Sequence, residues 1–84
     1  MFTVYALYSP NYQKIYIGYT SNLTERLISH NNLATKGFTV KFRPWEIVFQ
    51  EKCQEKKEAI QREKQLKSAK GRQFIWNIIS EKYP

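Results

Sequence analysis

Hydrophobic and polar residues alternate in two short segments near the start of the chain, residues 2–8 and residues 14–19. Both segments are rich in β-branched and aromatic side chains, a composition typical of β-strands. The residues between them, 9–12, include serine, proline and asparagine, which favour turns. The pattern therefore predicts a β-hairpin, and a symmetric four-residue turn would place Tyr5 directly opposite Tyr16.

This expected pairing separates the two faces of the hairpin. Val4 would face Ile17 and Ala6 would face Ile15, which gives one apolar face. The two tyrosines would lie on the other face. Gly18 would lie beside them and leave open space, so another backbone could approach the strand there.

The pattern changes to a helical period after the hairpin. Asn22, followed three residues later by Glu25, is typical of a helix start. Two leucines in residues 23–30 recur at the helical spacing and mark the inward side. Arg26 and His30, the only histidine, lie at the edge of that side. The sequence therefore predicts a strand that leads directly into a helix carrying a cation and an imidazole.

A third strand is expected in the middle of the chain. Residues 32–44 form a basic connection that contains proline and glycine, and residues 45–50 then alternate again. Trp45, Ile47 and Phe49 would share one side of this strand. It completes a small sheet, because two strands alone are only marginally stable in water.

Two helices are predicted in the C-terminal part. Residues 54–69 follow a helical period, and Glu63 falls within their apolar stripe, where a purely structural helix normally carries leucine or isoleucine. The Lys-Gly pair at residues 70–71 predicts the end of this helix, since glycine readily takes the left-handed conformation found there. Residues 74–83 predict a final helix, with Asn77 as its only uncharged amide.

The size and composition predict one α+β domain over residues 1–84. Its lone cysteine, Cys53, offers neither an internal disulfide nor a cysteine-based zinc site, which suits a cytoplasmic protein. No apolar run is long enough to cross a membrane, and no signal peptide precedes the first strand. We therefore expect a soluble, cytoplasmic protein without a membrane partner.

The charge balance predicts an anionic partner. Fourteen lysines and arginines face seven glutamates and no aspartate, for a net charge of +7. A basic domain with clustered lysines favours nucleic acid over the alternative that the charge only maintains solubility. Such side chains would neutralise phosphates without reading base sequence. The residues expected to do so are Lys36, Lys41, Arg43, Arg62, Lys67 and Lys70, together with Lys56, Lys57, Lys64 and Arg72.

Several residues break the local pattern and are candidates for chemistry. Each also has a structural explanation, since tyrosine pairs are often core aromatics and a buried glutamate often pairs with an arginine. Taken together, a phenol pair, a guanidinium and one acid on a basic protein suit phosphodiester chemistry. Because a two-metal site needs several acidic ligands, at most one metal ion is expected, held by the only inward-facing carboxylate. The candidates are Tyr5, Tyr16, Arg26, His30 and Glu63.

The same residues form a set of motifs that resembles the GIY-YIG nuclease superfamily. The resemblance covers about residues 3–77 and is closest to small stand-alone bacterial members related to the nuclease domain of the excinuclease cutting subunit, a DNA repair enzyme. Thr3 and Val4 depart from the usual glycine and isoleucine of the first motif. The motifs are Thr3-Val4-Tyr5, Tyr16-Ile17-Gly18, the helix with Arg26 and His30, and Arg62-Glu63-Lys64-Gln65-Leu66-Lys67.

The resemblance implies a three-stranded antiparallel sheet flanked by helices and a metal-dependent endonuclease activity, with DNA as the expected substrate. By position, Tyr5 would help to activate the attacking water, and Tyr16 would share that task or contact the scissile phosphate. Arg26 would stabilise the charge on the phosphate, and Glu63 would bind one Mg²⁺ or Mn²⁺. His30 matches a position that is histidine in some members, and Asn77 matches a late polar position. Gly18 and Asn77 are expected to contact the nucleic acid.

Two alternatives remain open at this stage. One is a nucleic-acid-binding module that keeps the scaffold but cleaves weakly or not at all. The other is a structural subunit whose basic face binds a larger protein. A homodimer or a protein partner is also plausible, because so small a domain has little surface with which to hold a duplex.

Overall fold

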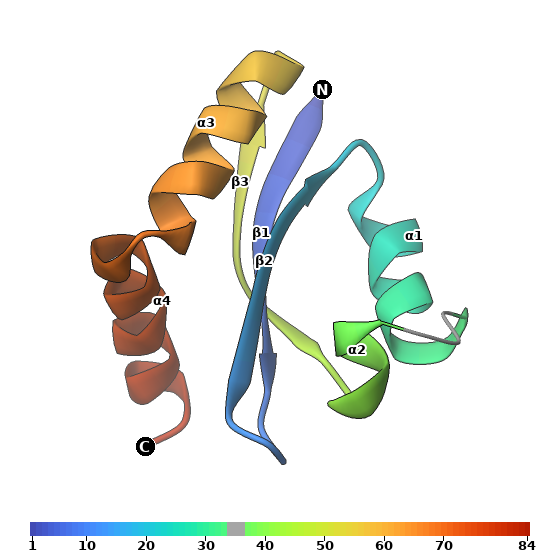
Figure 1. Cartoon of the computed structure of the whole chain (residues 1–84), viewed down its shortest axis with the longest axis vertical. Coiled ribbons are helices and arrows are strands. Elements are labelled where there is room, and N and C mark those ends of the chain that lie inside the picture. Colours follow the sequence, from blue (N-terminus) through green and yellow to red (C-terminus); the bar gives the residue numbers. More distant parts are fainter. Residues whose placement is uncertain (34–36) are drawn as a thin grey trace.

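A computed structural model describes residues 1–33 and 37–84 and contains a three-stranded antiparallel sheet (Figure 1). The strands are β1 (Phe2–Ser9), β2 (Lys14–Thr20) and β3 (Glu46–Cys53), and their order in the sheet is β2-β1-β3. The first strand is therefore central, and β2 forms one edge. This arrangement confirms the predicted α+β class and the three-stranded antiparallel sheet.

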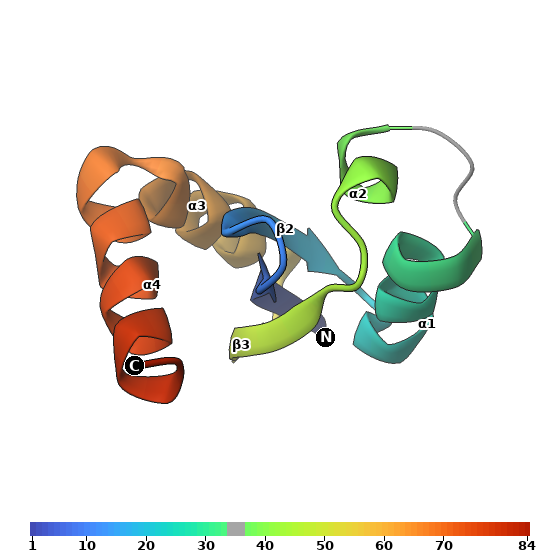
Figure 2. The same cartoon turned by 90° about the horizontal axis from the view of Figure 1, so that it is seen from below.

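Helices cover both faces of the sheet, as Figure 2 shows. On one side lie α3 (Lys56–Lys67) and α4 (Ala69–Lys82). On the other side lie α1 (Leu23–Ile28), the π-helical turn η1 (Ser29–Leu33) and α2 (Phe38–Lys41). None of the helices in the described ranges is long and apolar enough to cross a membrane.

Each face of the sheet has its own hydrophobic core. The predicted apolar face packs against α3 and α4. The face with the two tyrosines is buried as well, because Tyr5, Leu7 and Trp45 pack there with partly buried leucines of α1. The first core contains Val4, Ala6, Tyr8, Ile15, Ile17, Cys53, Ala59, Leu66, Ile75 and Ile79.

The register of the hairpin differs from the predicted one by two residues. Tyr5 pairs with Gly18, and Leu7 pairs with Tyr16. The four-residue turn spans residues 10–13 rather than 9–12, because β1 extends to Ser9, whose carbonyl accepts hydrogen bonds from the backbone N–H groups of the turn. An even shift keeps every side chain on its predicted face but removes the direct pairing of the tyrosines.

A bulge in β3 changes the predicted alternation of its side chains. Ala6 pairs with Phe49, but Leu7 pairs with Ile47, so Val48 is an extra residue. As a result Ile47 joins Trp45 on the face of α1, whereas Phe49 packs on the face of α4. The expectation that Trp45, Ile47 and Phe49 share one side is therefore wrong.

The boundary between the last two helices lies at Ser68, not at residues 70–71. Ser68 caps α4, and its hydroxyl accepts a hydrogen bond from the backbone N–H of Gly71 at 3.2 Å. Gly71 lies in the first turn of α4, where a Cβ would overlap the Gln65 carbonyl oxygen and the backbone of Leu66. The glycine thus allows two helices to meet closely and does not end the first one.

Candidate active site

A cleft at the outer side of β2 brings together four of the five predicted catalytic residues. Tyr5 comes from β1, Tyr16 from β2, Arg26 from α1 and Glu63 from α3. Although α3 covers the opposite face of the sheet from α1, β2 is an edge strand, so side chains from both layers can meet beside it. The cavity has a volume of about 360 Å³, and its other lining residues are Phe2, Gly18, Tyr19, Thr20, Ser21 and Lys56.

Gly18 determines where the two phenols lie. A Cβ on this residue would be 2.8 Å from the Tyr5 hydroxyl oxygen and 3.2 Å from a ring carbon of Tyr16. The two rings lie with their centroids 6.3 Å apart. The expected open space beside Gly18 is therefore filled by tyrosine side chains, and the glycine is required because the Tyr5 ring lies against its backbone.

His30 lies behind Tyr5 and contacts it directly. The distance between the Tyr5 hydroxyl oxygen and His30 Nε2 is 3.1 Å, within hydrogen-bond range. The imidazole is only 7% exposed, and its ring centroid is 4.8 Å from that of Tyr16. Burial, followed by the positive charges of Arg26 and Arg43, lowers the pKa of His30 from its ordinary value of 6.5. His30 is therefore neutral at pH 7, and in the tautomer with its proton on Nδ1 it can accept the phenolic proton on Nε2.

The Tyr5 phenol is protonated at neutral pH. Burial raises its pKa above the ordinary value of 10.0, and the neighbouring Tyr16 and Glu63 act in the same direction. Arg26 acts in the opposite direction, as a cation should, but burial outweighs it.

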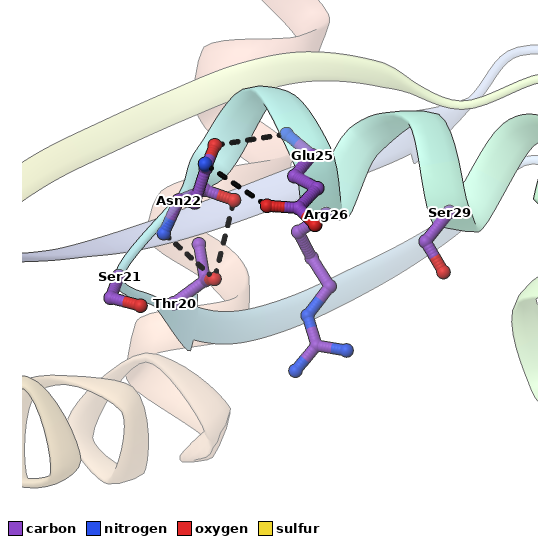
Figure 3. A pocket seen from close by; sticks show the side chains of 6 residues that line it. All are labelled: Thr20, Ser21, Asn22, Glu25, Arg26 and Ser29. Atoms are coloured by element: carbon purple, nitrogen blue, oxygen red, sulfur yellow. Dashed lines mark hydrogen bonds between the residues drawn. The ribbon is translucent and has the colours of Figure 1, made fainter.

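Figure 3 shows Arg26 extending away from α1 next to a cavity at the helix start, and the same residue also lines the cleft. The start of α1 is capped as predicted, because Asn22 Oδ1 accepts a hydrogen bond from the backbone N–H of Glu25 at 3.1 Å. Arg26 is exposed and makes no ion pair with any residue in the described part of the chain. Its guanidinium is thus available to hold an anion. A smaller cavity of about 280 Å³ also contacts Arg26. It is lined by Thr20, Ser21, Asn22, Glu25, Arg26 and Ser29.

Glu63 is the carboxylate of the cleft. Its side chain is 19% exposed, and Oε2 lies 3.6 Å from Nζ of Lys67, one helical turn further along α3. Within the described residues, no group of three or more histidine, cysteine or acidic side chains could hold a metal. One half-buried carboxylate fits Mg²⁺ or Mn²⁺ of the kind that keeps several waters and also binds substrate phosphate.

The basic residues predicted to bind nucleic acid do not share one surface. Arg43 donates hydrogen bonds to the carbonyl oxygens of His30 at 2.6 Å and Ser29 at 3.4 Å, so it stabilises η1. Arg62 forms an ion pair with Glu51 at 3.2 Å. Lys41, Lys67 and Lys70 are exposed, and Asn77 lies exposed on α4, where it accepts a hydrogen bond from Gln73. Lys36 lies outside the described residues.

Four residues of the cleft, Phe2, Tyr19, Thr20 and Ser21, were not identified from the sequence. Thr20 and Ser21 line it beside Arg26, but in the sequence they indicate only a helix start. Their place in the cleft depends on the path of the chain from the edge strand into α1. No local pattern encodes that path.

The fold and the cleft together define a small α+β catalytic domain of the GIY-YIG class. The model of the GIY-YIG catalytic domain matches residues 1–77, and the chain belongs to this family. The superfamily consists of endonucleases that generally depend on a divalent metal ion.

Several bacterial proteins are similar over most of the chain. A UPF0213 protein of Staphylococcus saprophyticus is 37% identical over 67 residues, and the match covers 80% of each chain. UPF0213 proteins of two Staphylococcus epidermidis strains are 39% identical over 54 residues, which is 64% of this chain and 66% of theirs. The names of these relatives state no activity. No solved structure matches the chain.

Proposed function

We propose that residues 1–84 form a metal-dependent endonuclease that hydrolyses phosphodiester bonds in nucleic acid, with DNA as its substrate. The observation that supports this proposal most strongly is the shared cleft of Tyr5, Tyr16, Arg26 and Glu63. A phosphate in a cavity of this size would contact a cation, two phenols and a carboxylate at once. The family membership of the chain supports the same reaction class.

Arg26 would hold the scissile phosphate. Its guanidinium has no ion pair with a residue that the structure describes, and Arg26 lines the cleft. Guanidinium binds phosphate through two parallel hydrogen bonds, and these strengthen as charge develops on the phosphate oxygens. The phenol of Tyr16 is the second contact that we assign to the scissile phosphate.

Glu63 would hold one Mg²⁺ or Mn²⁺, and the bound ion would supply positive charge beside the reacting phosphate. In this arrangement the carboxylate contributes the only protein ligand. The remaining ligands would be water and substrate oxygens. Metal affinity in the absence of nucleic acid should therefore be weak.

Tyr5 and His30 would together accept the proton of the attacking water. As the water oxygen forms a bond to phosphorus, its proton passes to the Tyr5 oxygen while the phenolic proton passes to His30 Nε2. The bond from phosphorus to the leaving oxygen breaks, and that oxygen takes a proton from solvent. This relay never requires a free phenolate, which the raised pKa of Tyr5 disfavours. It uses His30 as a neutral imidazole, the form that the lowered pKa of this residue favours.

The proposal is tested with labelled plain, flapped and branched DNA and with RNA of the same sequences, in Mg²⁺, in Mn²⁺ and in EDTA. We expect cleavage of DNA that requires the metal. Glu63→Gln should reduce the rate at least about 100-fold, and Glu81→Gln, which removes an exposed carboxylate near the end of α4, should not change it. If the protein binds every substrate but cleaves none, it is a binding module. If it neither binds nor cleaves, both functions are contradicted.

A further inference from the structure

A second cavity lies beside the candidate active site, along the middle of β2. It has a volume of about 510 Å³ and is lined by three consecutive strand residues, Ile15, Tyr16 and Ile17, and by two cations, Lys67 and Arg72. Lys67 lies at the end of α3, and Arg72 lies in the first turns of α4. The junction of these helices thus places two positive charges next to the outer edge of the sheet.

This cavity adjoins the active-site cleft. Tyr16 lines both cavities. Glu63 in the cleft and Lys67 in the second cavity are joined by their ion pair at 3.6 Å. A chain of phosphates that enters the cleft at Arg26 therefore reaches Lys67 and Arg72 next if it follows β2.

The charges at this edge are available to a ligand. Arg72 is exposed and makes no ion pair with a residue in the described ranges. The Lys67 side chain is 52% exposed, and its ion pair with Glu63 is of the i,i+4 kind that contributes little stability in water. The alternative is that both cations only protect the edge strand, because lysine and arginine at an open edge prevent another strand from pairing with it.

We propose that Lys67 and Arg72 bind the phosphate next to the scissile one, so that the nucleic-acid strand follows the outer edge of β2 from Arg26 to Arg72. The inference rests on the proposed function for the position of the scissile phosphate. It adds the requirement that the substrate places at least two consecutive phosphates along the outer edge of β2. The cleft alone does not impose this requirement.

The test measures binding of short DNA oligonucleotides by fluorescence anisotropy in EDTA, where no cleavage occurs. In a series of oligonucleotides, one phosphate at a time is replaced by an uncharged methylphosphonate. The wild-type protein should lose about tenfold in affinity when the phosphate of the subsite is replaced. Arg72→Gln should lose affinity for the unmodified oligonucleotide and be less sensitive than the wild type when that same phosphate is neutral, because only one of the two cations remains to bind its charge. Lys67→Gln should behave in the same way.

Lys52→Gln is the matched control, because Lys52 is exposed on β3, at the opposite edge of the sheet. It should remain sensitive to the same methylphosphonate as the wild type. The proposal is overturned if Arg72→Gln stays as sensitive as the wild type to the methylphosphonate at every position. It is also overturned if the variants bind DNA as the wild type does and differ only in self-association, as expected if the cations only protect the edge strand. The assay involves no metal and no bond cleavage, so it does not depend on the nuclease function. If the variants lose part of their sensitivity at one phosphate but the protein does not cut DNA, the subsite is supported and only the nuclease function is contradicted.

Discussion

Tyr5 is the residue whose environment most limits how the site can work. Its ring packs against the Gly18 backbone, its hydroxyl contacts His30, and burial keeps it protonated. A tyrosine on the sheet surface could serve as an independent phenolate only at high pH. In this site the contribution of Tyr5 depends on the imidazole of His30. This residue was expected at the edge of a helix and lies buried behind the Tyr5 ring.

Gly18→Ala tests this packing. The new methyl group would meet the Tyr5 hydroxyl oxygen, 2.8 Å from the Cβ position, and displace the phenol from His30. We expect the cleavage rate to fall about 100-fold, as for other small misplacements of a reacting group. The melting temperature should change little, because the preference of about 0.5–1 kcal/mol for alanine over glycine in a strand offsets part of the cost of moving the buried Tyr5 ring. Full activity of the variant would mean that this position of Tyr5 is not needed.

The protonation of His30 can be observed directly, because it is the only histidine. Its ring proton resonances should titrate with a pKa below 6.5 in the folded protein. The unfolded chain binds this proton at a higher pH than the folded protein does, so the free energy of unfolding should decrease as the pH falls below about 6.5 towards the folded pKa. His30→Gln should remove that part of the decrease. A pKa at or above 6.5 would contradict the burial of the imidazole and the influence of the two arginines.

At the scale of elements, the hydrophobic pattern predicted the strands, the start of α1 and the apolar face of the hairpin. These follow from local periodicity and capping. The register, the bulge at Val48 and the break at Ser68 were not predicted, because each depends on contacts between elements. Gly71 is an example. Its sequence context is that of a helix end, and only the packing of α4 on α3 shows that the glycine is needed for the close contact of the two helices.

The junction of α3 and α4 should therefore respond unusually to Gly71→Ala. In an ordinary helix this change stabilises the protein by up to about 1 kcal/mol. Here the Cβ would overlap the backbone of the preceding helix, and we expect a loss of about 2–4 kcal/mol in urea unfolding. Lys70→Ala, at the exposed neighbouring position, should stay within about 0.5 kcal/mol of the wild type. Stabilisation by Gly71→Ala would contradict the close contact of the two helices.

The position of η1, and with it that of His30, should depend on Arg43. This side chain was expected to bind nucleic acid, but its guanidinium donates hydrogen bonds to two carbonyl oxygens of η1, including that of His30. Lysine cannot reproduce this fork. Arg43→Lys should therefore reduce the cleavage rate about tenfold or more and leave DNA affinity and its salt dependence unchanged. A change in affinity with an unchanged rate would support the original expectation.

For the whole molecule, a net charge of +7 on 84 residues should make DNA binding strongly dependent on salt. For each phosphate contact, the logarithm of the binding constant should fall with a slope of about −0.7 to −0.9 against the logarithm of salt concentration. Anisotropy titrations between about 50 and 200 mM salt measure this slope. An affinity that does not change over that range would contradict phosphate binding by the basic side chains.

The architecture explains why the candidate active site could be predicted only in part. Sequence motifs identified Tyr5, Tyr16, Arg26 and Glu63, but not that the edge position of β2 lets helices from opposite faces of the sheet contribute to one cleft. The same edge brings Lys67 and Arg72 beside the cleft. Lys67 and Arg72, which the sequence predicted as phosphate-binding residues without a defined position, thus line the cavity next to the proposed reaction centre.

The most direct measurement is the single-turnover cleavage rate of a labelled oligonucleotide by the wild type, Arg26→Gln, Glu63→Gln and the double variant, with Lys52→Gln as control. If the two side chains act on one phosphate, each single variant should be at least about 100-fold slower. The double variant should then be little slower than the worse single one, because residues that act as a unit are not additive. Cleavage by the double variant at the wild-type rate would show that the reaction occurs elsewhere and contradict the account.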